Sequence, residues 1–382
     1  MERRAATPRA GWRERVESLG LIWHTAPDGA PYWDESAYYS FTRAEIDTIE
    51  RASAELYRLF LAAGEEIAND RDALDVFGVP EYCHRAIRDA WDREPPALNY
   101  GRMDLGYDGT GEPKLFEFNC DTPTSMLETG VIQWDWREAM FPELDQFTSL
   151  HEKLIGKWAD LRAHLPNAEI WFAHSADKMG EDTLTTTYMR DLAEQAGLKT
   201  HGVVIDDIGL DHRGRFVDRA NLPMSAVFKL YPWEWLVDEA YGPDLVRNLP
   251  DTVWIEPIWK MIWSNKAVLQ VLWAMNPGHP NLLAASVRQK RVGASYVAKP
   301  FLSREGGNVR VVREGAEIAR TGGAYAEGLT IHQELYPLRD FGGSYPVLGS
   351  WLVDGQPAGM GIREDGLITG NNARFVPHVI EG

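Results

Sequence analysis

Apolar residues recur at three- and four-residue steps between residues 42 and 64, which is the period of an amphipathic helix. The repeating positions are Ile46, Ile49, Ala52, Leu56 and Leu59. Thr42 with Glu45 three positions later has the spacing of a capping box, and Gly64 is of the type that ends helices. A helix is therefore predicted here, whereas the first forty residues are polar and irregular and predict no regular element.

A different pattern follows between residues 168 and 205. Short apolar runs at 170–173 and 203–205 flank a helical segment at 183–196, which Gly197 closes. A strand, a helix and a second strand in this order form a β-α-β unit, whose two strands are parallel. We therefore expect an α/β subdomain with a parallel sheet.

Strand-like alternation dominates the stretches before and after this unit. Residues 100–141 show short apolar runs broken by turns, and residues 295–375 alternate such runs with glycine-rich turns, which indicates a mostly antiparallel sheet. A helix predicted at 265–275 meets a strong stop signal at 276–278. The chain is thus expected to be of the α/β (α+β) class.

Composition places the chain among folded globular proteins. Of its 382 residues, 44% are hydrophobic and 25% charged. Cys83 and Cys120 cannot form a disulfide framework, so a reducing compartment such as the cytoplasm is expected. The chain start lacks the pattern of a signal peptide, and no run of about 18 apolar residues occurs, so neither export nor a membrane span is expected.

Acidic residues outnumber basic ones, 57 to 39, for a formal net charge of −18. Such a chain repels a phosphate backbone, which argues against nucleic acid as the main partner. The same field favours a cationic substrate such as a polyamine, although an ordinary solvated acidic surface is the simpler explanation. Charge alone leaves both interpretations open.

The sharpest local pattern is the strand-like segment 114–119, followed by Asp-Thr-Pro. Side chains alternate along a strand, so Glu117 and Asn119 are expected on one face and Phe116 and Phe118 on the other. The segment therefore presents two oxygen ligands in the same direction.

Arg102 and Asp104 are likewise two residues apart in the strand before this one, so the polar groups of both strands converge if the strands pair. Carboxylate and amide oxygens without a nearby histidine or thiolate suit Mg²⁺ rather than zinc. The alternative is the ordinary polar face of an antiparallel hairpin, and periodicity leaves the two interpretations nearly even.

Three further groups could meet a phosphate. Lys299 lies on a predicted strand, and the glycine pair 306–307 after it can bring backbone N–H groups close to phosphate oxygens. Lys266 follows Ser264 at the expected start of a helix, where anions are favoured. Arg363 lies on a glycine-flanked strand. Each also has an ordinary explanation as a turn, a helix cap or a solvated side chain.

Six segments, taken together and in this order, resemble the glutathionylspermidine synthase family, including its stand-alone acid–amine ligase relatives. They are residues 100–105, 114–125, 229–235, 256–266, 297–309 and 361–365. The second reads Lys-Leu-Phe-Glu-Phe-Asn-Cys-Asp-Thr-Pro-Thr-Ser, and the fifth reads Val-Ala-Lys-Pro-Phe-Leu-Ser-Arg-Glu-Gly-Gly-Asn-Val. The resemblance extends over nearly the whole chain.

This resemblance implies an ATP-grasp-like fold, in which two β-rich lobes close on ATP, together with a pre-ATP-grasp-like parallel α/β subdomain. The lobes are expected at approximately 1–160 and 255–382 and the α/β substrate subdomain at approximately 165–250, all within one ligase unit over residues 1–382. The metal-binding strand precedes the nucleotide lysines, the reverse of the usual ATP-grasp order.

The resemblance also implies roles for individual residues. The Mg²⁺ ligands are expected to be Asp104, Glu117 and Asn119, and the ATP-phosphate lysines Lys266 and Lys299. Catalytic arginines at the reacting phosphate are expected to be Arg102 and Arg363. A lid loop over the nucleotide is expected at Arg304, Glu305, Gly306 and Gly307, and the adenine is expected near Gln333, Glu334 and Leu335. A looser match places the substrate near Ser125, Trp233 and Glu234.

The implied reaction joins a small-molecule acid to an amine, with a polyamine or a peptide among the candidates. It uses ATP and Mg²⁺, passes through an acyl phosphate and forms ADP. Two alternatives stay open: a small-molecule kinase, which needs no amine, and a non-catalytic protein that binds nucleotide or polyamine. The amidase domain of bifunctional family members is not expected, because the residues before Tyr100 are too few and lack its nucleophile pattern.

Overall fold

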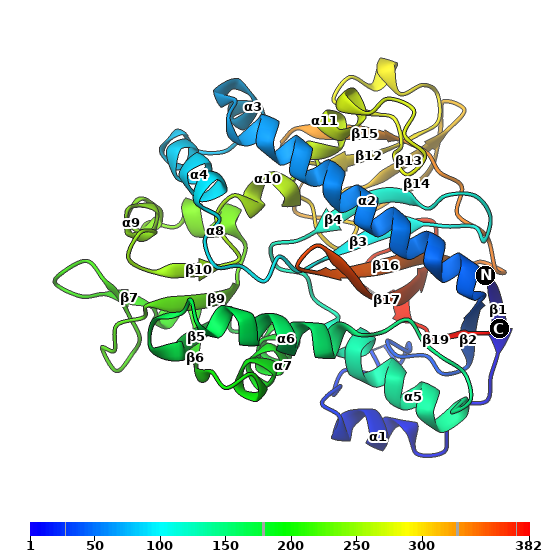
Figure 1. Ribbon diagram of the computed structural model, residues 1–382. Coiled ribbons are helices and arrows are strands. Elements are labelled where there is room, and N and C mark those ends of the chain that lie inside the picture. The colour runs from blue at the N-terminus through cyan, green and yellow to red at the C-terminus, as the bar shows by residue number, and fades with distance from the viewer. Residues whose placement is uncertain (27, 178–179, 326–327, 372) are drawn as a thin grey trace.

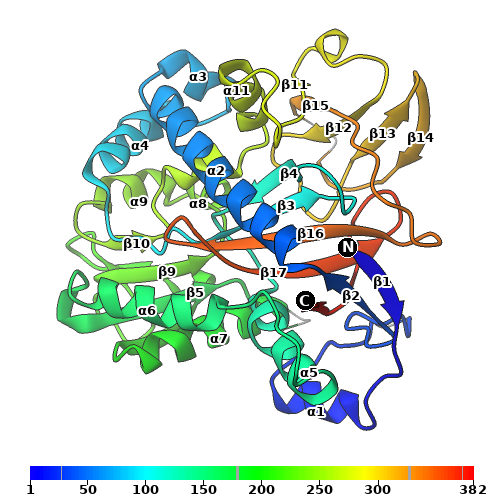
Figure 2. The same cartoon turned by 45° about the vertical axis from the view of Figure 1, so that its right-hand side comes forward.

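Two antiparallel sheets of five strands each and one parallel sheet of four strands make up most of the β structure (Figure 1). The computed structural model describes residues 1–26, 28–177, 180–325, 328–371 and 373–382. Helices pack between and around these sheets (Figure 2). The mixture confirms the predicted α/β (α+β) class.

The first antiparallel sheet contains the predicted hairpin. Its strands in spatial order are β18 (Arg374–Phe375), β17 (Gln356–Asp365), β16 (Tyr345–Val353), β3 (Gly101–Gly106) and β4 (Lys114–Asn119). β3 pairs with β4 on one side and with β16 on the other, both antiparallel. The N-terminal hairpin and the C-terminal strands, far apart in sequence, thus share one sheet.

The second antiparallel sheet carries the predicted lysine strand. Its strands in spatial order are β11 (Ala285–Ser286), β15 (Thr330–Glu334), β12 (Tyr296–Pro300), β13 (Arg310–Arg313) and β14 (Ala316–Arg320). The mostly antiparallel structure expected over residues 295–375 is confirmed in these two sheets. The hairpin β3–β4 comes before β12 in the chain, so the predicted metal-binding strand precedes the strand of Lys299.

The parallel sheet contains the predicted β-α-β unit. Its strands in spatial order are β10 (Val253–Ile255), β9 (Ala226–Leu230), β5 (Glu169–His174) and β6 (Lys199–Val204). The connecting helix α7 (Glu181–Gln195) packs on β5 and β6 and also contacts α6 (Leu150–Arg162), as Figure 2 shows. All three strand pairs are parallel, so this prediction is confirmed.

The predicted amphipathic helix is α2 (Arg43–Ala68), which crosses the first antiparallel sheet (Figure 1). The capping box of Thr42 and Glu45 is present. The predicted end at Gly64 is wrong, because the helix continues for another turn. A Cβ at Gly64 would overlap the ring of Trp91, so this glycine allows the close approach of an indole to the helix.

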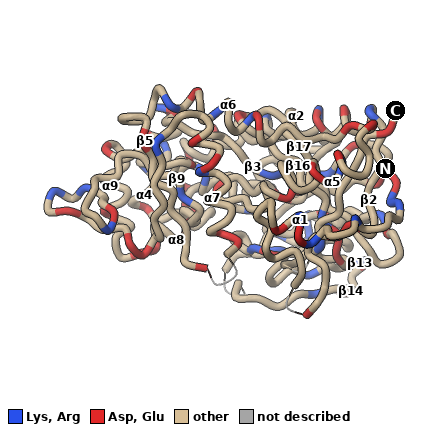
Figure 3. Tube along the Cα trace, turned by 90° about the horizontal axis from the view of Figure 1, so that it is seen from below, with Lys and Arg blue, Asp and Glu red and all other residues tan. Residues whose placement is uncertain are grey.

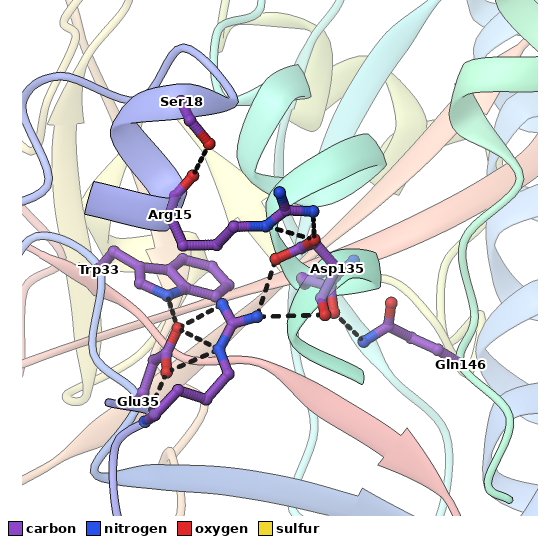
Figure 4. A network of polar contacts seen from close by, with 8 residues as sticks. Arg15, Ser18, Trp33, Glu35, Asp135 and Gln146 are labelled. Carbon is purple, nitrogen blue, oxygen red and sulfur yellow. Dashed lines mark hydrogen bonds and ion pairs between the residues drawn. The ribbon is translucent and has the colours of Figure 1, made fainter. Parts of the chain in front are cut away.

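The prediction that the first forty residues are irregular is wrong for three short elements, whereas the described residues between 19 and 36 contain no helix or strand. β1 (Glu2–Ala5) pairs with β2 (Ala37–Phe41), which also pairs with the C-terminal β19 (His378–Ile380), while α1 (Trp12–Ser18) lies between them in the chain. Figure 4 shows Arg15 pairing with Asp135 of α5 (Gln133–Met140). Arg9 forms ion pairs with both Asp135 and Glu35. Long-range pairing, invisible to local periodicity, orders these polar residues.

Aromatic side chains fill the core where α2 meets the hairpin and the shorter helices. Trp263 is 1% exposed and packs edge to face against Tyr57 and Phe60 of α2. The shorter helices are α3 (Arg71–Val76), α4 (Glu81–Arg93), α8 (Trp233–Asp238), α9 (Gly242–Asn248), α10 (Lys260–Ser264) and α11 (Val268–Met275). The many tryptophans therefore serve packing to a large extent.

Charged residues of both signs are interspersed along the chain (Figure 3). Acidic residues are in excess, in keeping with the formal charge of −18. Within the described ranges, no helix combines the length and apolar character that crossing a membrane requires.

Candidate active site

A cavity of about 420 Å³ opens where the two antiparallel sheets face α8 and the start of α7. Most of the residues that the sequence singles out line this cavity. They are Arg102, Asp104, Glu117, Asn119, Ser125, Glu234, Lys266, Lys299, Arg304, Glu305, Gly306, Gln333, Glu334, Leu335 and Arg363. Gly307 and Trp233 are not among the lining residues. The hairpin, the lysine strand and the arginine strand, separated in sequence, therefore meet at one site.

The expected metal ligands are brought together by the register of β3 and β4. Asp104 lies opposite Glu117, and Arg102 lies opposite Asn119. The amide nitrogen of Asn119 is 3.3 Å from Asp104 Oδ2 and 3.3 Å from Glu117 Oε1. The two carboxylates and the amide thus form one polar cluster inside the cavity.

The expected alternation of β4 is broken at Phe116. The register shifts between Asp104 and Leu105, so that β4 has one extra residue and bulges there. As a result Leu115 and Phe118 are buried in the core, while Phe116 lines the cavity beside Glu117. The prediction that Phe116 and Phe118 share the opposite face is therefore wrong for Phe116.

Two arginines hold the carboxylate of Asp104. Arg102 Nε is 2.8 Å from Asp104 Oδ1, and Arg363 Nη2 is 2.6 Å from Asp104 Oδ2. Burial by itself would raise the pKa of Asp104, but the two guanidinium groups outweigh it and lower that pKa to about 2. Arg102 is held in turn by the carbonyl oxygen of Thr124, which accepts from Nη1 at 2.8 Å.

The two lysines approach Glu117 and its neighbours. Lys266 Nζ is 3.1 Å from Glu117 Oε2 and also donates to the carbonyl of Ser303. Lys299 Nζ donates to Gln333 Oε1 at 2.8 Å and to the carbonyl of Phe116 at 3.1 Å. Burial lowers the pKa of Lys299 to about 8, with Glu117 opposing and Lys266 reinforcing that shift.

Lys266 does not start a helix, contrary to the prediction. Ser264 is the last residue of α10, and the next helix, α11, begins at Val268. Asn265 accepts from the backbone of Ala267 at 2.9 Å and donates to the carbonyl of Phe77 at 2.8 Å, which fixes the break between the helices. Lys266 is thus presented by a rigid bend, and its ammonium group, not a helix terminus, contacts Glu117.

The expected lid loop reaches across the cavity. Arg304 forms an ion pair with Glu234 of α8, and its guanidinium carbon is 4.7 Å from the ring centre of Trp235. Glu305 and Gly306 follow with positive φ angles of 53° and 66°, which turn the loop back toward β13. The loop is therefore tied to the α/β side of the molecule.

Trp233, which the resemblance places near the substrate, is not among the residues that line the cavity, whereas Trp235 of the same helix is. Trp233 is fully buried, and its indole N–H donates to the carbonyl of Glu256 at 2.8 Å. Trp235, two positions on, is 43% exposed and lines the cavity. The helical turn sends the two rings to opposite sides, a distinction that the motif does not contain.

Asp121 is a residue whose contacts the sequence does not reveal. It is 2% exposed and forms an ion pair with the fully buried Lys229, while its other oxygen accepts from the backbone N–H of Trp233 at 2.8 Å. The loop after β4 and the start of α8 are thus joined beneath the cavity. Asp121 and Lys229 both lie in segments that resemble the family, so the sequence points to the two residues but not to their pairing.

An acidic group at the α7 side of the cavity is also absent from the predicted site. Glu181 and Asp182, the first residues of α7, line the cavity with Tyr32. Burial, followed by the nearby carboxylate of Glu128, raises the pKa of Glu181 to about 7. The hydroxyl of Tyr32 donates to Glu128 at 2.6 Å. Acidic residues at a helix start are common, so the sequence offers no distinguishing signal for this group.

The cluster on β3 and β4 fits a magnesium ion by its chemistry. Asp104, Glu117 and Asn119 offer hard oxygen donors, and the amide can present either its nitrogen or its oxygen. No group of three His, Cys, Asp or Glu side chains suited to a metal occurs in the part of the chain that is described. A Mg²⁺ ion here would therefore take its remaining oxygen ligands from a substrate and from water, as is usual for this ion.

Comparison with known proteins identifies relatives of this chain. Residues 3–381 match the family model described as "Glutathionylspermidine synthase preATP-grasp". A Haemophilus influenzae protein named "Putative acid--amine ligase" is 36% identical, over 96% of this chain and 95% of that protein. The "Bifunctional glutathionylspermidine synthetase/amidase" of Escherichia coli is 28% identical over 93% of this chain, which spans 61% of that longer protein.

A solved structure shares the fold at low sequence identity. It is a glutathione synthetase-like effector from Globodera pallida, with a TM-score of 0.59 and 11% identity over 97% of this chain and 96% of that one. The resemblance drawn from the six segments is confirmed by the family match. This chain belongs to the glutathionylspermidine synthase preATP-grasp family.

Proposed function

We propose that this protein is an ATP- and Mg²⁺-dependent acid–amine ligase that forms an amide through an acyl phosphate. In the first stage a substrate carboxylate attacks the γ-phosphate of ATP and releases ADP. In the second stage an amine attacks the acyl carbon and displaces phosphate. Membership of this family gives the ligase class, and the cavity supports the mechanism.

The observation that carries the proposal is the charge arrangement of the cavity. Four cationic side chains, Arg102, Lys266, Lys299 and Arg363, surround the two carboxylates Asp104 and Glu117. The cations exceed the carboxylates by two, which suits a triphosphate that arrives with a divalent cation. Mg²⁺ bound by Asp104, Glu117 and Asn119 would neutralise phosphate charge.

In this proposal Arg102 and Arg363 stabilise the transferring phosphoryl group. Both guanidinium groups are held by Asp104, and both arginines line the cavity. Preorganised donors of this kind supply most of the catalysis in phosphoryl transfer, because they need not reorient as charge develops. Lys266 and Lys299 hold the phosphates in line.

The nucleotide base is proposed to lie beside β15. Gln333 is fixed by two hydrogen bonds, from Lys299 to its side-chain oxygen and from its amide to the carbonyl of Leu115 at 2.8 Å. Glu334 and Leu335 continue this wall of the cavity, together with the apolar Val297 of β12. This arrangement supports a planar base stacked between the strand and the lid loop that contains Arg304.

The acidic end of the cavity is proposed to receive the amine. Glu181 and Asp182 line the cavity there, whereas Glu234 is already paired with Arg304, so a cationic amine is drawn to the first two carboxylates and away from Arg102 and Arg363. An ammonium must lose a proton before it attacks, and a carboxylate whose pKa is raised to about 7 is suited to accept it. Ser125 also lines the cavity, next in the chain to Thr124, whose carbonyl oxygen accepts from Arg102.

The test is a screen of the purified protein for release of ADP and phosphate. Carboxylic acids and amines are combined in a matrix, with glutathione and spermidine as the first pair, and each hit is identified by mass spectrometry. The expected result is sustained release only when an acid and an amine are both present. Formation of AMP and pyrophosphate would rule out the acyl phosphate route.

The same screen separates the two alternatives. A small-molecule kinase would form ADP over many turnovers without any amine and would yield a phosphorylated product. A non-catalytic protein would bind Mg²⁺ and ATP but show no turnover with any acid–amine mixture. Either result would replace the ligase proposal.

A further inference from the structure

Gly349 lies in β16, beside an arginine that the proposed mechanism uses. β16 pairs with β3 (Figure 2), and in their register Trp351 lies opposite Arg102 while Gly349 lies opposite Asp104. Trp351 is fully buried and fills the position directly across from Arg102. Because Arg102 Nε donates to Asp104, the stem of Arg102 runs toward Asp104 and passes over Gly349, its diagonal neighbour on the next strand.

This close approach leaves no room for a side chain at position 349. A Cβ atom at Gly349 would lie 2.7 Å from Cδ and 3.2 Å from Cγ of Arg102. The third of its nearest atoms among the described residues is the carbonyl oxygen of Gly361, at the ordinary contact distance of 3.4 Å. Carbon atoms pack at about 3.5–4.0 Å. The overlap therefore falls on the stem of Arg102 and not on Asp104 or the backbone.

Backbone conformation does not explain this glycine. Gly349 is not among the glycines with a positive φ angle, so an alanine could adopt the same backbone without strain. Within a strand a glycine is unfavourable, because it has no side chain to pack and gains nothing from its conformational freedom. The local reason for a glycine at this position is thus the space that Arg102 takes.

Arg102 has little freedom to move aside. It is 7% exposed, and it donates to Asp104 Oδ1 and to the carbonyl oxygen of Thr124, both at 2.8 Å. Its guanidinium carbon also lies 5.8 Å from the ring centre of Trp351. A Cβ at position 349 would push the stem by about 1 Å. A shift of that size would lengthen or break one of the two hydrogen bonds and displace the guanidinium group.

We propose that Gly349 is a positioning residue, whose missing side chain keeps open the place of the Arg102 stem and so sets the guanidinium group at the reacting phosphate. This inference rests on the proposed function, in which Arg102 stabilises the transferring phosphoryl group. Gly349 itself is not among the residues that line the cavity, so it acts only through Arg102. A catalytic group misplaced by about 1 Å can lower turnover roughly 10²-fold.

The first measurement is turnover of Gly349→Ala with the acid–amine pair that the screen identifies. We expect kcat to fall roughly 10²-fold, while the KM for ATP changes less than about threefold, because the two lysines still hold the phosphates. Gly209→Ala in the short strand β7 (Gly209–Leu210) is the matched control. Gly209 has no positive φ, and a Cβ there would lie 3.8 Å from Val217, so kcat should be unchanged.

The second measurement is NMR of protein labelled at the arginine nitrogens, which needs no turnover. The Nε–H group of Arg102 is buried and donates to Asp104, so its proton should exchange slowly with water. Arg102→Lys identifies its signal by removing it. In Gly349→Ala the signal should shift and its proton should exchange faster, whereas Gly209→Ala should leave both unchanged.

Arg102→Ala provides a background in which the overlap is gone. There Gly349→Ala should change the remaining kcat less than about twofold, because no stem is left to displace. If Gly349→Ala alone fails to fold, the double variant should fold, for the same reason. A wild type without turnover would refute the proposed function alone, and the NMR comparison would still decide whether Gly349 positions Arg102.

Three outcomes would overturn the proposal. The first is a kcat for Gly349→Ala within about twofold of an active wild type, or an Arg102 signal that does not move. The second is an equal loss of kcat in the Arg102→Ala background, which would show that Gly349 acts through another group. The third is a double variant that stays unfolded where Gly349→Ala is unfolded, which would place the overlap elsewhere.

Discussion

Replacing Asp121 by asparagine tests the buried ion pair that joins two walls of the active site. Asp121 is 2% exposed and Lys229 is fully buried. The loop after β4 contributes Thr122, Thr124 and Ser125 to the cavity, and the start of α8 contributes Glu234 and Trp235, so the pair connects residues on both sides. The substitution removes the charge and keeps nearly the same shape.

The size of the effect follows from what the variant leaves behind. Asparagine can still accept from the backbone N–H of Trp233, so that hydrogen bond is retained. Lys229 keeps a buried ammonium without its counter-ion, and removing one partner of such a pair costs about 3–5 kcal/mol. Because the lysine can release its proton, we expect the lower end, about 3 kcal/mol at pH 7.

The pH dependence gives a second, independent check. Burial lowers the pKa of Lys229 even in the wild type, where Asp121 opposes the shift. Without Asp121 the pKa of Lys229 in the folded state falls further below its pKa in the unfolded chain. Between these two pKa values the unfolded chain binds more protons than the folded one, so the stability of the variant rises with pH. The deficit of the variant should therefore narrow as the pH rises toward the ordinary pKa of lysine, about 10.4.

The assay is urea unfolding of wild type, Asp121→Asn, Lys229→Met and the double variant, followed by fluorescence. The double variant should recover part of the loss, because no buried charge is left unpaired. Asp244→Asn, which removes one partner of an exposed ion pair with Arg247, is the control and should leave the midpoint nearly unchanged. Equal midpoints for Asp121→Asn and wild type, or a deficit that does not change with pH, would refute the reasoning.

Three further predictions concern the active site. Arg102→Ala should keep ATP binding and lose turnover by roughly 10²-fold or more; equal losses in both would show that the arginine only positions the nucleotide. Glu117→Gln should raise the Mg²⁺ concentration needed for half-maximal turnover at least tenfold, and an unchanged requirement would place the metal elsewhere. Lys299 has a pKa lowered to about 8, so ATP, which raises that pKa, should bind with proton uptake near pH 8 and more weakly above it. Calorimetry in buffers of different ionisation enthalpy measures the uptake, and its persistence in Lys299→Met would contradict this assignment.

Local pattern is sufficient to predict the elements that are stabilised by near neighbours in the chain. The capping box of Thr42 and Glu45 starts α2, and the β-α-β unit and the hairpin β3–β4 follow from apolar runs and turns. The types of residue that form the active site can also be predicted from local pattern. Glu117 and Asn119 fall on the same side of β4 because strand geometry repeats every two residues, whereas Asp104 joins them only through the register of β3 with β4.

Tertiary structure decides the features in which distant segments meet. The helix continues through Gly64, where the missing Cβ leaves room for the ring of Trp91. Phe116 lines the cavity because β4 bulges against β3. The strands near the start of the chain form because β1 pairs with β2 and β2 pairs with the C-terminal strand β19.

The same distinction holds for charge. Asp121 and Lys229 are 108 positions apart in the sequence, and only the packed structure brings them together as an ion pair. Local periodicity reports which face of an element is apolar, since that depends on neighbours within a few residues. Which face meets which, and which charges are buried together, depends on long-range packing, and no local pattern contains that information.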